Sequence, residues 1–102
     1  MFVKTEPYRS VSSTEITTGS TGVVALAANR FRKYALFIVD GAAPAYLWLG
    51  NSSEAAANKG IRINANGGSY EMSMVLGNLW AGVVAAASTA ANTLLVLEGY
   101  TT

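Results

Sequence analysis

Carboxylates are the side chains in this sequence that are best suited to acid and base chemistry. The chain has six acidic residues and no histidine or cysteine. The missing types exclude imidazole and thiolate metal ligands, cysteine nucleophiles and Ser-His or Cys-His dyads. A glycosidase would need two carboxylates held close together. The six fall in separate predicted elements, with no motif linking two of them: Glu6, Glu15, Asp40, Glu54, Glu71 and Glu98.

We therefore expect a protein that is not an enzyme, with no cofactor and no metal. Two further patterns resemble ligand-binding motifs. Gly67–Gly68 could cradle a phosphate, but no helix start and no P-loop Lys-Ser/Thr pair follow, so a hairpin turn explains it. Arg30, Arg32 and Lys33 surround Phe31, yet a net charge of +1 is too small to gather nucleic acid. We interpret this basic cluster as a solvated strand edge that opposes aggregation.

Aromatic residues supply another candidate site. Tyr46 and Trp48 share one face of a predicted strand, and Trp80 and Tyr100 occur later in the chain. Such rings can stack on a sugar, so they define a candidate carbohydrate-binding platform. Aromatic residues on the strands of a small β domain also commonly form its core, and both interpretations stay open at this point.

The densest apolar stretch of the chain surrounds these residues. Residues 34–39 (YALFIV) have no polar break, as expected for a strand buried on both faces, and residues 45–49 (AYLWL) form a second strand. Asp40–Gly41 and Pro44 lie between them and favour a reversal of the chain. We predict a central hairpin that contributes these core residues: Phe37, Ile38, Leu47 and Leu49.

The rest of the chain alternates short strand patterns with turns rich in Gly, Asn and Ser. One or two helical turns are expected within residues 51–59. Further strands are expected at residues 12–18, 23–27, 60–64, 69–74, 79–87 and 93–100. The fold class is therefore all-β, with about eight short antiparallel strands in a β-sandwich or jelly roll and little helix. Residues 1–10 are predicted to be an N-terminal arm, and residues 11–102 a single β domain.

The composition indicates a surface that is partly covered by other molecules. Apolar residues make up 51% of the chain and charged residues only 13%, about half of the ~25% that is usual for soluble domains. Exposed strand edges also need cover, so we expect a homo-oligomer. The alternative is a small protein that its Ser, Thr, Asn and Gly residues keep soluble. No apolar run reaches the ~18 residues of a membrane span, and the N-terminal residues lack the pattern of a signal peptide. We therefore expect no membrane partner and no export by the general secretory route.

Five short motifs, taken together, give the chain a family resemblance. They are N-R at 29–30 with K-Y-A-L at 33–36, Y-L-W-L-G at 46–50, K-G-I-R-I at 59–63, G-G-S-Y-E at 67–71, and L-L-V-L-E-G at 94–99. Over residues 19–100 the sequence resembles small β-rich virion structural proteins of tailed bacteriophages, of the capsid decoration (cement) or head-fibre type.

The resemblance implies a non-enzymatic virion protein, most simply a capsid decoration protein that binds and stabilises the head. It implies the major capsid protein or other virion subunits as partners, a trimer as the favoured homo-oligomer, and a place on the capsid surface after assembly in the host cytoplasm. The alternative is a carbohydrate- or receptor-binding module of a fibre or tail, in which Tyr46, Trp48 and Trp80 would stack on the sugar.

The N-terminal arm lies outside the resemblance and carries apolar residues with no predicted strand partner. Phe2, Val3 and Tyr8 are the residues concerned, and Pro7 interrupts the segment. We hypothesise that they form an interface with a neighbouring protomer or capsid subunit. The alternative is that the arm folds back as an edge strand of its own sheet.

Overall fold

The computed structural model describes residues 10–101, which fold as eight β-strands in two antiparallel sheets. The strands are β1 (Ser10–Thr18), β2 (Val23–Leu26), β3 (Arg32–Val39), β4 (Ala45–Leu49), β5 (Ile61–Ile63), β6 (Ser69–Ser73), β7 (Val84–Ser88) and β8 (Asn92–Tyr100). One turn of 3-10 helix, Ser52–Glu54, lies between β4 and β5. The predicted all-β class is confirmed.

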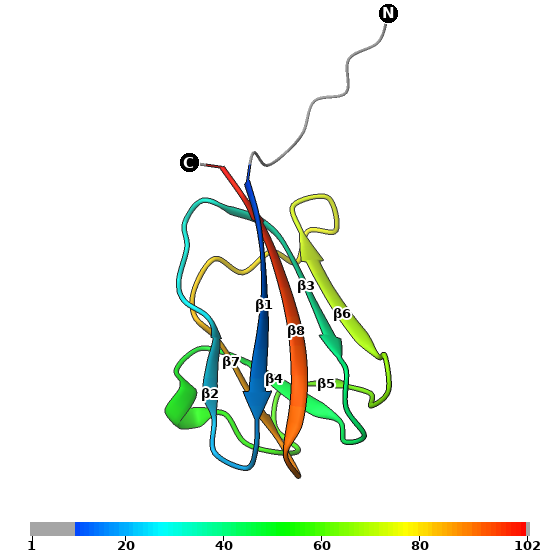
Figure 1. The fold of residues 1–102 in the computed structure, drawn as a ribbon. Helices are drawn as coiled ribbons and strands as arrows, with labels where there is room; N and C mark the ends of the chain where they lie inside the picture. Colours follow the sequence, from blue (N-terminus) through cyan, green and yellow to red (C-terminus); the bar gives the residue numbers. More distant parts are fainter. Residues whose placement is uncertain (1–9, 102) are drawn as a thin grey trace, which may run out of the picture.

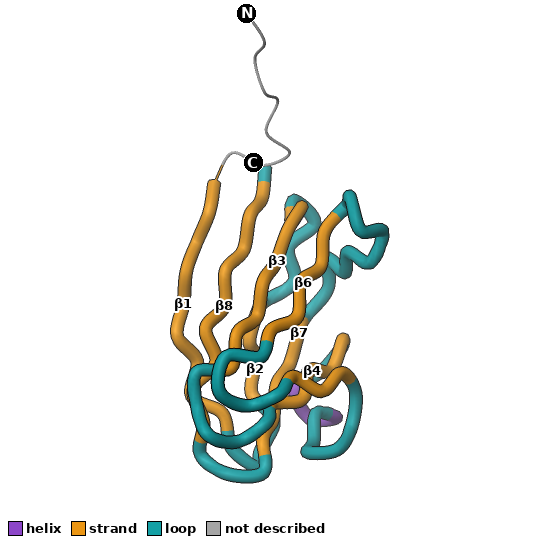
Figure 2. The backbone as a smooth tube through the Cα atoms, turned by 90° about the vertical axis from the view of Figure 1, so that its right-hand side faces the viewer, coloured by secondary structure: helices purple, strands orange, loops and turns teal. Residues whose placement is uncertain are grey.

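The strand pairs are nested, which defines the topology. β1 pairs with β8, β2 with β7, β3 with β6, and β4 with β5. The chain is thus one long hairpin whose turn lies between β4 and β5. Successive strand pairs of this hairpin belong alternately to the two sheets. The strand orders of the sheets are β1-β8-β3-β6 and β2-β7-β4-β5 (Figures 1 and 2). This is the order of a jelly roll. Consequently β1 begins and β8 ends at the same end of the sandwich.

The predicted hairpin between residues 34–39 and 45–49 is wrong, because β3 and β4 belong to different sheets. The connection between them crosses from one sheet to the other, and hydrogen bonds hold it to the start of β8. Asp40 N donates to Thr93 O at 2.9 Å, and the Asn92 side-chain amide donates to Ala43 O. Asp-Gly favours a change of direction, but it does not specify that the flanking strands pair.

The turn at Asn66–Gly67 is present, with φ values of 58° and 98° that suit asparagine and glycine. It too connects strands of different sheets, β5 and β6, so the predicted hairpin is again wrong. β7 begins only at Val84, and residues 79–83 form a loop rather than the start of the strand. The wrong hairpin arises because local turn chemistry does not choose a pairing partner.

The start of β1 at Ser10 is one residue before the predicted domain boundary. The remainder of the predicted arm lies outside the described residues. It includes the hypothetical interface residues Phe2, Val3 and Tyr8, and also Glu6.

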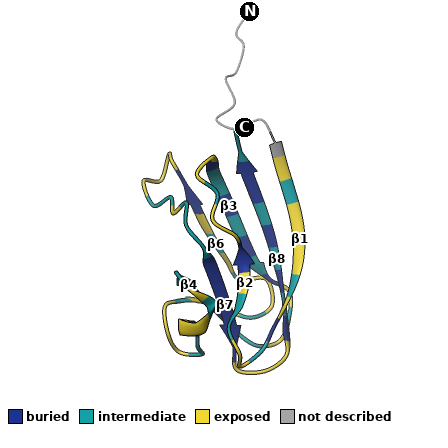
Figure 3. Cartoon of the chain, turned by 90° about the vertical axis from the view of Figure 1, so that its left-hand side faces the viewer, coloured by how far each residue is buried: buried dark blue, intermediate teal, exposed yellow. Residues whose placement is uncertain are grey.

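Alternate residues of each strand point between the sheets and form the core. On β3 the buried apolar residues are Ala35, Phe37 and Val39, and the other sheet contributes side chains such as Leu47. β7 is buried along its whole length, whereas most of β1 is exposed (Figure 3). Phe37 and Leu47 are therefore core residues, as predicted. Ile38 is not, because it is half-buried on the opposite face of β3.

Candidate interaction surfaces

The acidic side chains are tied to different parts of the fold. Glu71 accepts a hydrogen bond from the Tyr34 hydroxyl at 2.6 Å, and Glu54 accepts one from the Trp48 indole N–H at 3.3 Å. Glu98 is buried. Within residues 10–101, no group of three or more His, Cys, Asp or Glu side chains could hold a metal ion. These bonds attach the carboxylates to separate strands and loops rather than to one centre.

Arg32 is buried, which contradicts the prediction of a solvated basic edge. Only 1% of the residue is exposed, and its Nε donates to Glu98 Oε2 at 2.7 Å. Nη1 donates to the carbonyl oxygens of Trp80 and Gly82, at 2.6 and 3.0 Å. Nη2 donates to the carbonyl of Ala27 at 2.7 Å. Arginine fits here because its planar guanidinium offers several donors in fixed directions.

This arginine clamp, formed by Arg32 and Glu98 with the three carbonyls, joins β8 to two connections of the sandwich. One is the β2–β3 connection and the other is the segment before β7. Asn29 adds a bond to Glu98 Oε2 at 3.3 Å. Among residues 10–101, no buried side-chain nitrogen or oxygen lacks a partner. The clamp is thus a structural unit in which every guanidinium nitrogen has a partner within the chain.

The other two basic residues of the cluster differ from Arg32. Arg30 is exposed and lies over the Phe31 ring, 4.8 Å from its centroid, and Lys33 is half-buried. Phe31 is itself exposed, and its carbonyl accepts a bond from Thr101 N at 2.9 Å. This bond places the β2–β3 connection at the end of the sandwich where β8 ends.

A second apolar loop lies at the same end. Met74, Val75 and Leu76, here called the apolar tip, are all exposed, and 91% of Val75 is accessible to solvent. Leu76 N donates to Ser73 Oγ at 3.0 Å, and Gly77 N donates to Ser73 O at 3.1 Å. The loop projects beyond the end of β6 (Figure 1). Because these hydrogen bonds fix its backbone, the tip presents its apolar side chains in a preformed shape.

The outer face of the β1-β8-β3-β6 sheet has an aliphatic centre. Its four residues, here called the aliphatic block, are Leu36, Ile38, Leu95 and Leu97. Leu36 lies opposite Leu97 and Ile38 opposite Leu95, so the four form two adjacent rows on the central strands β3 and β8. All four are half-buried, while the alternate residues of both strands fill the core. The prediction that residues 34–39 form a strand buried on both faces is therefore correct for the inner face only, because the apolar residues of the outer face are half-buried.

The edge strands of this sheet surround the aliphatic block with polar residues. Each edge presents one serine and one glutamate beside it: Ser13 and Glu15 on β1, and Ser69 and Glu71 on β6. All four are exposed. An apolar centre with a polar rim is the usual anatomy of a protein–protein interface.

The aromatic residues proposed for sugar stacking differ in exposure, and each makes a contact within the chain. Tyr46 is buried, with its hydroxyl 3.0 Å from Asn58 Oδ1. Trp48 is half-buried, and Lys59 Nζ lies 4.6 Å from the centroid of its ring. Trp80 is exposed and belongs to the loop before β7, where its indole N–H donates to the carbonyl of Val83 at 2.9 Å.

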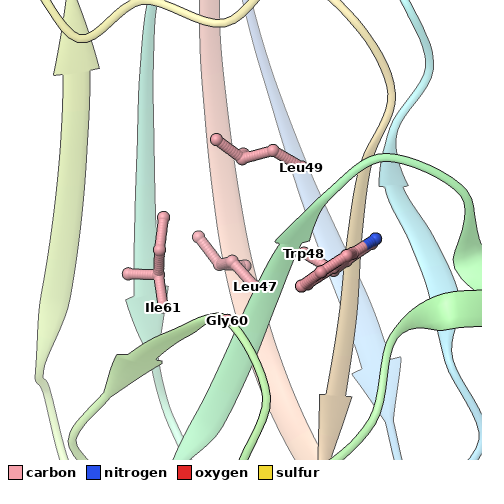
Figure 4. Close-up of a pocket in the computed structure, with 5 residues that line it drawn as sticks. All are labelled: Leu47, Trp48, Leu49, Gly60 and Ile61. Atoms are coloured by element: carbon pink, nitrogen blue, oxygen red, sulfur yellow. The ribbon is translucent and has the colours of Figure 1, made fainter.

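A pocket of about 260 Å³ lies beside Trp48 (Figure 4). Its lining residues are Leu47, Trp48, Leu49, Gly60 and Ile61. Gly60 has a φ of 93°, and a Cβ there would lie 2.1 Å from Leu47 O, so only glycine permits this close approach. The lining carries no carboxylate, amide or hydroxyl group, and it therefore gives sugar hydroxyls no side-chain acceptor.

Comparisons with protein-family models, with curated proteins and with solved structures return no match. Over residues 10–101, none of the helical structure is long and apolar enough to cross a membrane. A function is therefore proposed from the surfaces described above together with the motifs of the sequence.

Proposed function

We propose that this protein is a non-enzymatic structural protein of a phage particle, a capsid decoration (cement) protein that binds and stabilises the head. The observation that carries the proposal is the apolar tip. Three consecutive apolar side chains are exposed on a loop whose backbone is fixed by hydrogen bonds. Preformed apolar anchors of this kind bind with little loss of conformational freedom.

The end of the sandwich that carries the apolar tip is the proposed attachment surface. Phe31 is exposed on the neighbouring connection, and β1, into which the N-terminal segment leads, begins at the same end. The low proportion of charged residues also suits a protein whose surface is covered by neighbours at high local concentration. The proposed partners are the major capsid protein or other virion subunits, and the proposed location is the capsid surface.

Substituting Val75 by aspartate tests the attachment surface. Because Val75 is 91% exposed, the variant should fold and melt like the wild type. A charge placed in an apolar contact should weaken co-sedimentation with empty capsids by at least about 10-fold. Val24→Asp is the matched control, since Val24 is also exposed but lies on the other sheet. Unchanged co-sedimentation of the Val75→Asp protein would contradict this surface.

Deleting residues 2–8 tests the N-terminal segment separately. If Phe2, Val3 and Tyr8 anchor the protein, the shortened chain should keep its melting temperature but lose affinity for particles. Unchanged particle binding, or outright unfolding, would exclude the segment as an anchor.

A different pattern would support the fibre or tail alternative. The full chain would not bind particles, and it would bind to a glycan array in a way that Trp48→Ala or Trp80→Ala abolishes.

A further inference from the structure

We propose that two copies of this protein pack face to face through the outer face of the β1-β8-β3-β6 sheet. The partner is a second copy of the chain, and the contact is centred on the aliphatic block. The inference concerns the free protein. It does not depend on capsid binding, for which we propose a different surface, the apolar tip.

The pairing of the strands gives this face a repeated order of residues. Across the sheet from β1 to β6, one row reads Glu15, Leu95, Ile38 and Ser69. From β6 to β1, the adjacent row reads Glu71, Leu36, Leu97 and Ser13. Both rows have the order glutamate, aliphatic, aliphatic, serine. The face therefore has a local two-fold symmetry about the centre of the aliphatic block.

This symmetry makes the face complementary to itself. If a two-fold axis between the faces runs along the strands, Glu15 lies over Ser69 of the second copy, and Glu71 over Ser13. If the axis runs across the strands, Glu15 lies over Ser13, and Glu71 over Ser69. In both arrangements the aliphatic blocks meet, and every carboxylate faces a hydroxyl donor. In an isologous contact the same patch of both copies must be complementary to itself. Neither arrangement places two glutamates opposite each other, so this condition is met.

The size of the face indicates a reversible dimer. Four strands about 4.8 Å apart and about seven residues long cover roughly 19 by 24 Å. Two such faces would remove on the order of 1,000 Å² from solvent, which is near the lower limit for specific interfaces. Sheets of two domains can pack in this way at a separation of about 10 Å and a relative angle of about 30°.

Sedimentation equilibrium of the full chain, from micromolar to millimolar concentration, tests the inference. We expect a monomer–dimer equilibrium. Ser13→Lys would place an ammonium group opposite a glutamate of the second copy, twice in each dimer, and should lower the dissociation constant roughly 3- to 10-fold at low salt. Ser13→Glu should raise it by a similar factor. Thr21→Lys is the control, because it adds the same charge on an exposed turn away from this face.

Two combined variants then identify the axis. If the axis runs along the strands, adding Glu71→Lys to Ser13→Lys should remove the gain in affinity, whereas adding Glu15→Lys should not. If the axis runs across the strands, these two results should be exchanged. Ser69→Lys, on the other edge of the sheet, should increase the affinity of the dimer as much as Ser13→Lys does. It is a second variant with the same expected result, in case one of the two folds poorly.

Several results would overturn the proposed contact. They are a monomer at every concentration, a trimer mass, or a dimer whose affinity does not respond to the substitutions of Ser13 and Ser69. Capsid co-sedimentation of the same variants separates the two proposals. A wild-type chain that stays monomeric at every concentration but binds particles normally would reject this inference and leave the proposed decoration function intact.

Discussion

Replacing Arg32 by methionine is expected to reduce the free energy of unfolding by about 3–5 kcal/mol, which is a large part of the stability of a small domain. Methionine keeps much of the apolar bulk but removes every guanidinium donor. The Glu98 carboxylate, which the protein encloses with Arg32, would then lose its counter-ion. The carbonyls of Trp80, Gly82 and Ala27 would also lose their partners. Urea unfolding, followed by tryptophan fluorescence, measures the change.

The control for this experiment is Arg30→Met, the same chemical change at an exposed position. It should alter stability by less than about 0.5 kcal/mol. Because most of the cost at Arg32 arises from the charge left unpaired, adding Glu98→Leu to Arg32→Met should recover a substantial part of the loss. A cost below about 1 kcal/mol for Arg32→Met alone would show that the clamp does not hold the sandwich together.

Truncating Phe37 to alanine should cost about 3–5 kcal/mol, because the side chain is completely buried between the two sheets and its removal leaves a cavity. For a domain of this size, such a loss should lower the melting temperature by more than about 10 °C. Thermal unfolding followed by circular dichroism provides the measurement. It is best made at low concentration, so that self-association does not add to the stability of the wild type.

Ile38→Ala is the matched control for Phe37→Ala, because the two residues are neighbours on β3 and face opposite sides of the sheet. Ile38 is only half-buried, so its truncation should cost roughly 1 kcal/mol in the monomer. Equal losses for the two variants would contradict the assignment of Phe37 to the core and Ile38 to the outer face.

The two proposed contacts are centred on different parts of the jelly roll. The aliphatic block lies on the outer face of one sheet, whereas the apolar tip projects from the end of the sandwich. The two surfaces adjoin at Glu71, which lies beside the aliphatic block and lines a pocket together with the three residues of the apolar tip. The homo-oligomer predicted from the low charge content remains a prediction, and the symmetry of the aliphatic block favours two copies over the three that the sequence resemblance suggested.

The sequence by itself determined the fold class and the approximate positions of most strands. Side chains alternate along an extended backbone, so strand patterns are local and can be read from neighbouring residues. Turn signals such as Asn66–Gly67 are equally local. The apolar runs at residues 34–39 and 94–97 also indicated two strands with apolar residues on both faces.

Only the tertiary structure decided which strands pair and which charged residues are buried. β3 follows the same local rules whether it pairs with β4 or, as observed, with β6 and β8. Arg32 looked like its neighbours Arg30 and Lys33, because its partners Trp80, Gly82 and Glu98 are 48 to 66 residues away in the chain. Pairing and burial depend on the path of the connections, and no residue type within a single strand encodes that path.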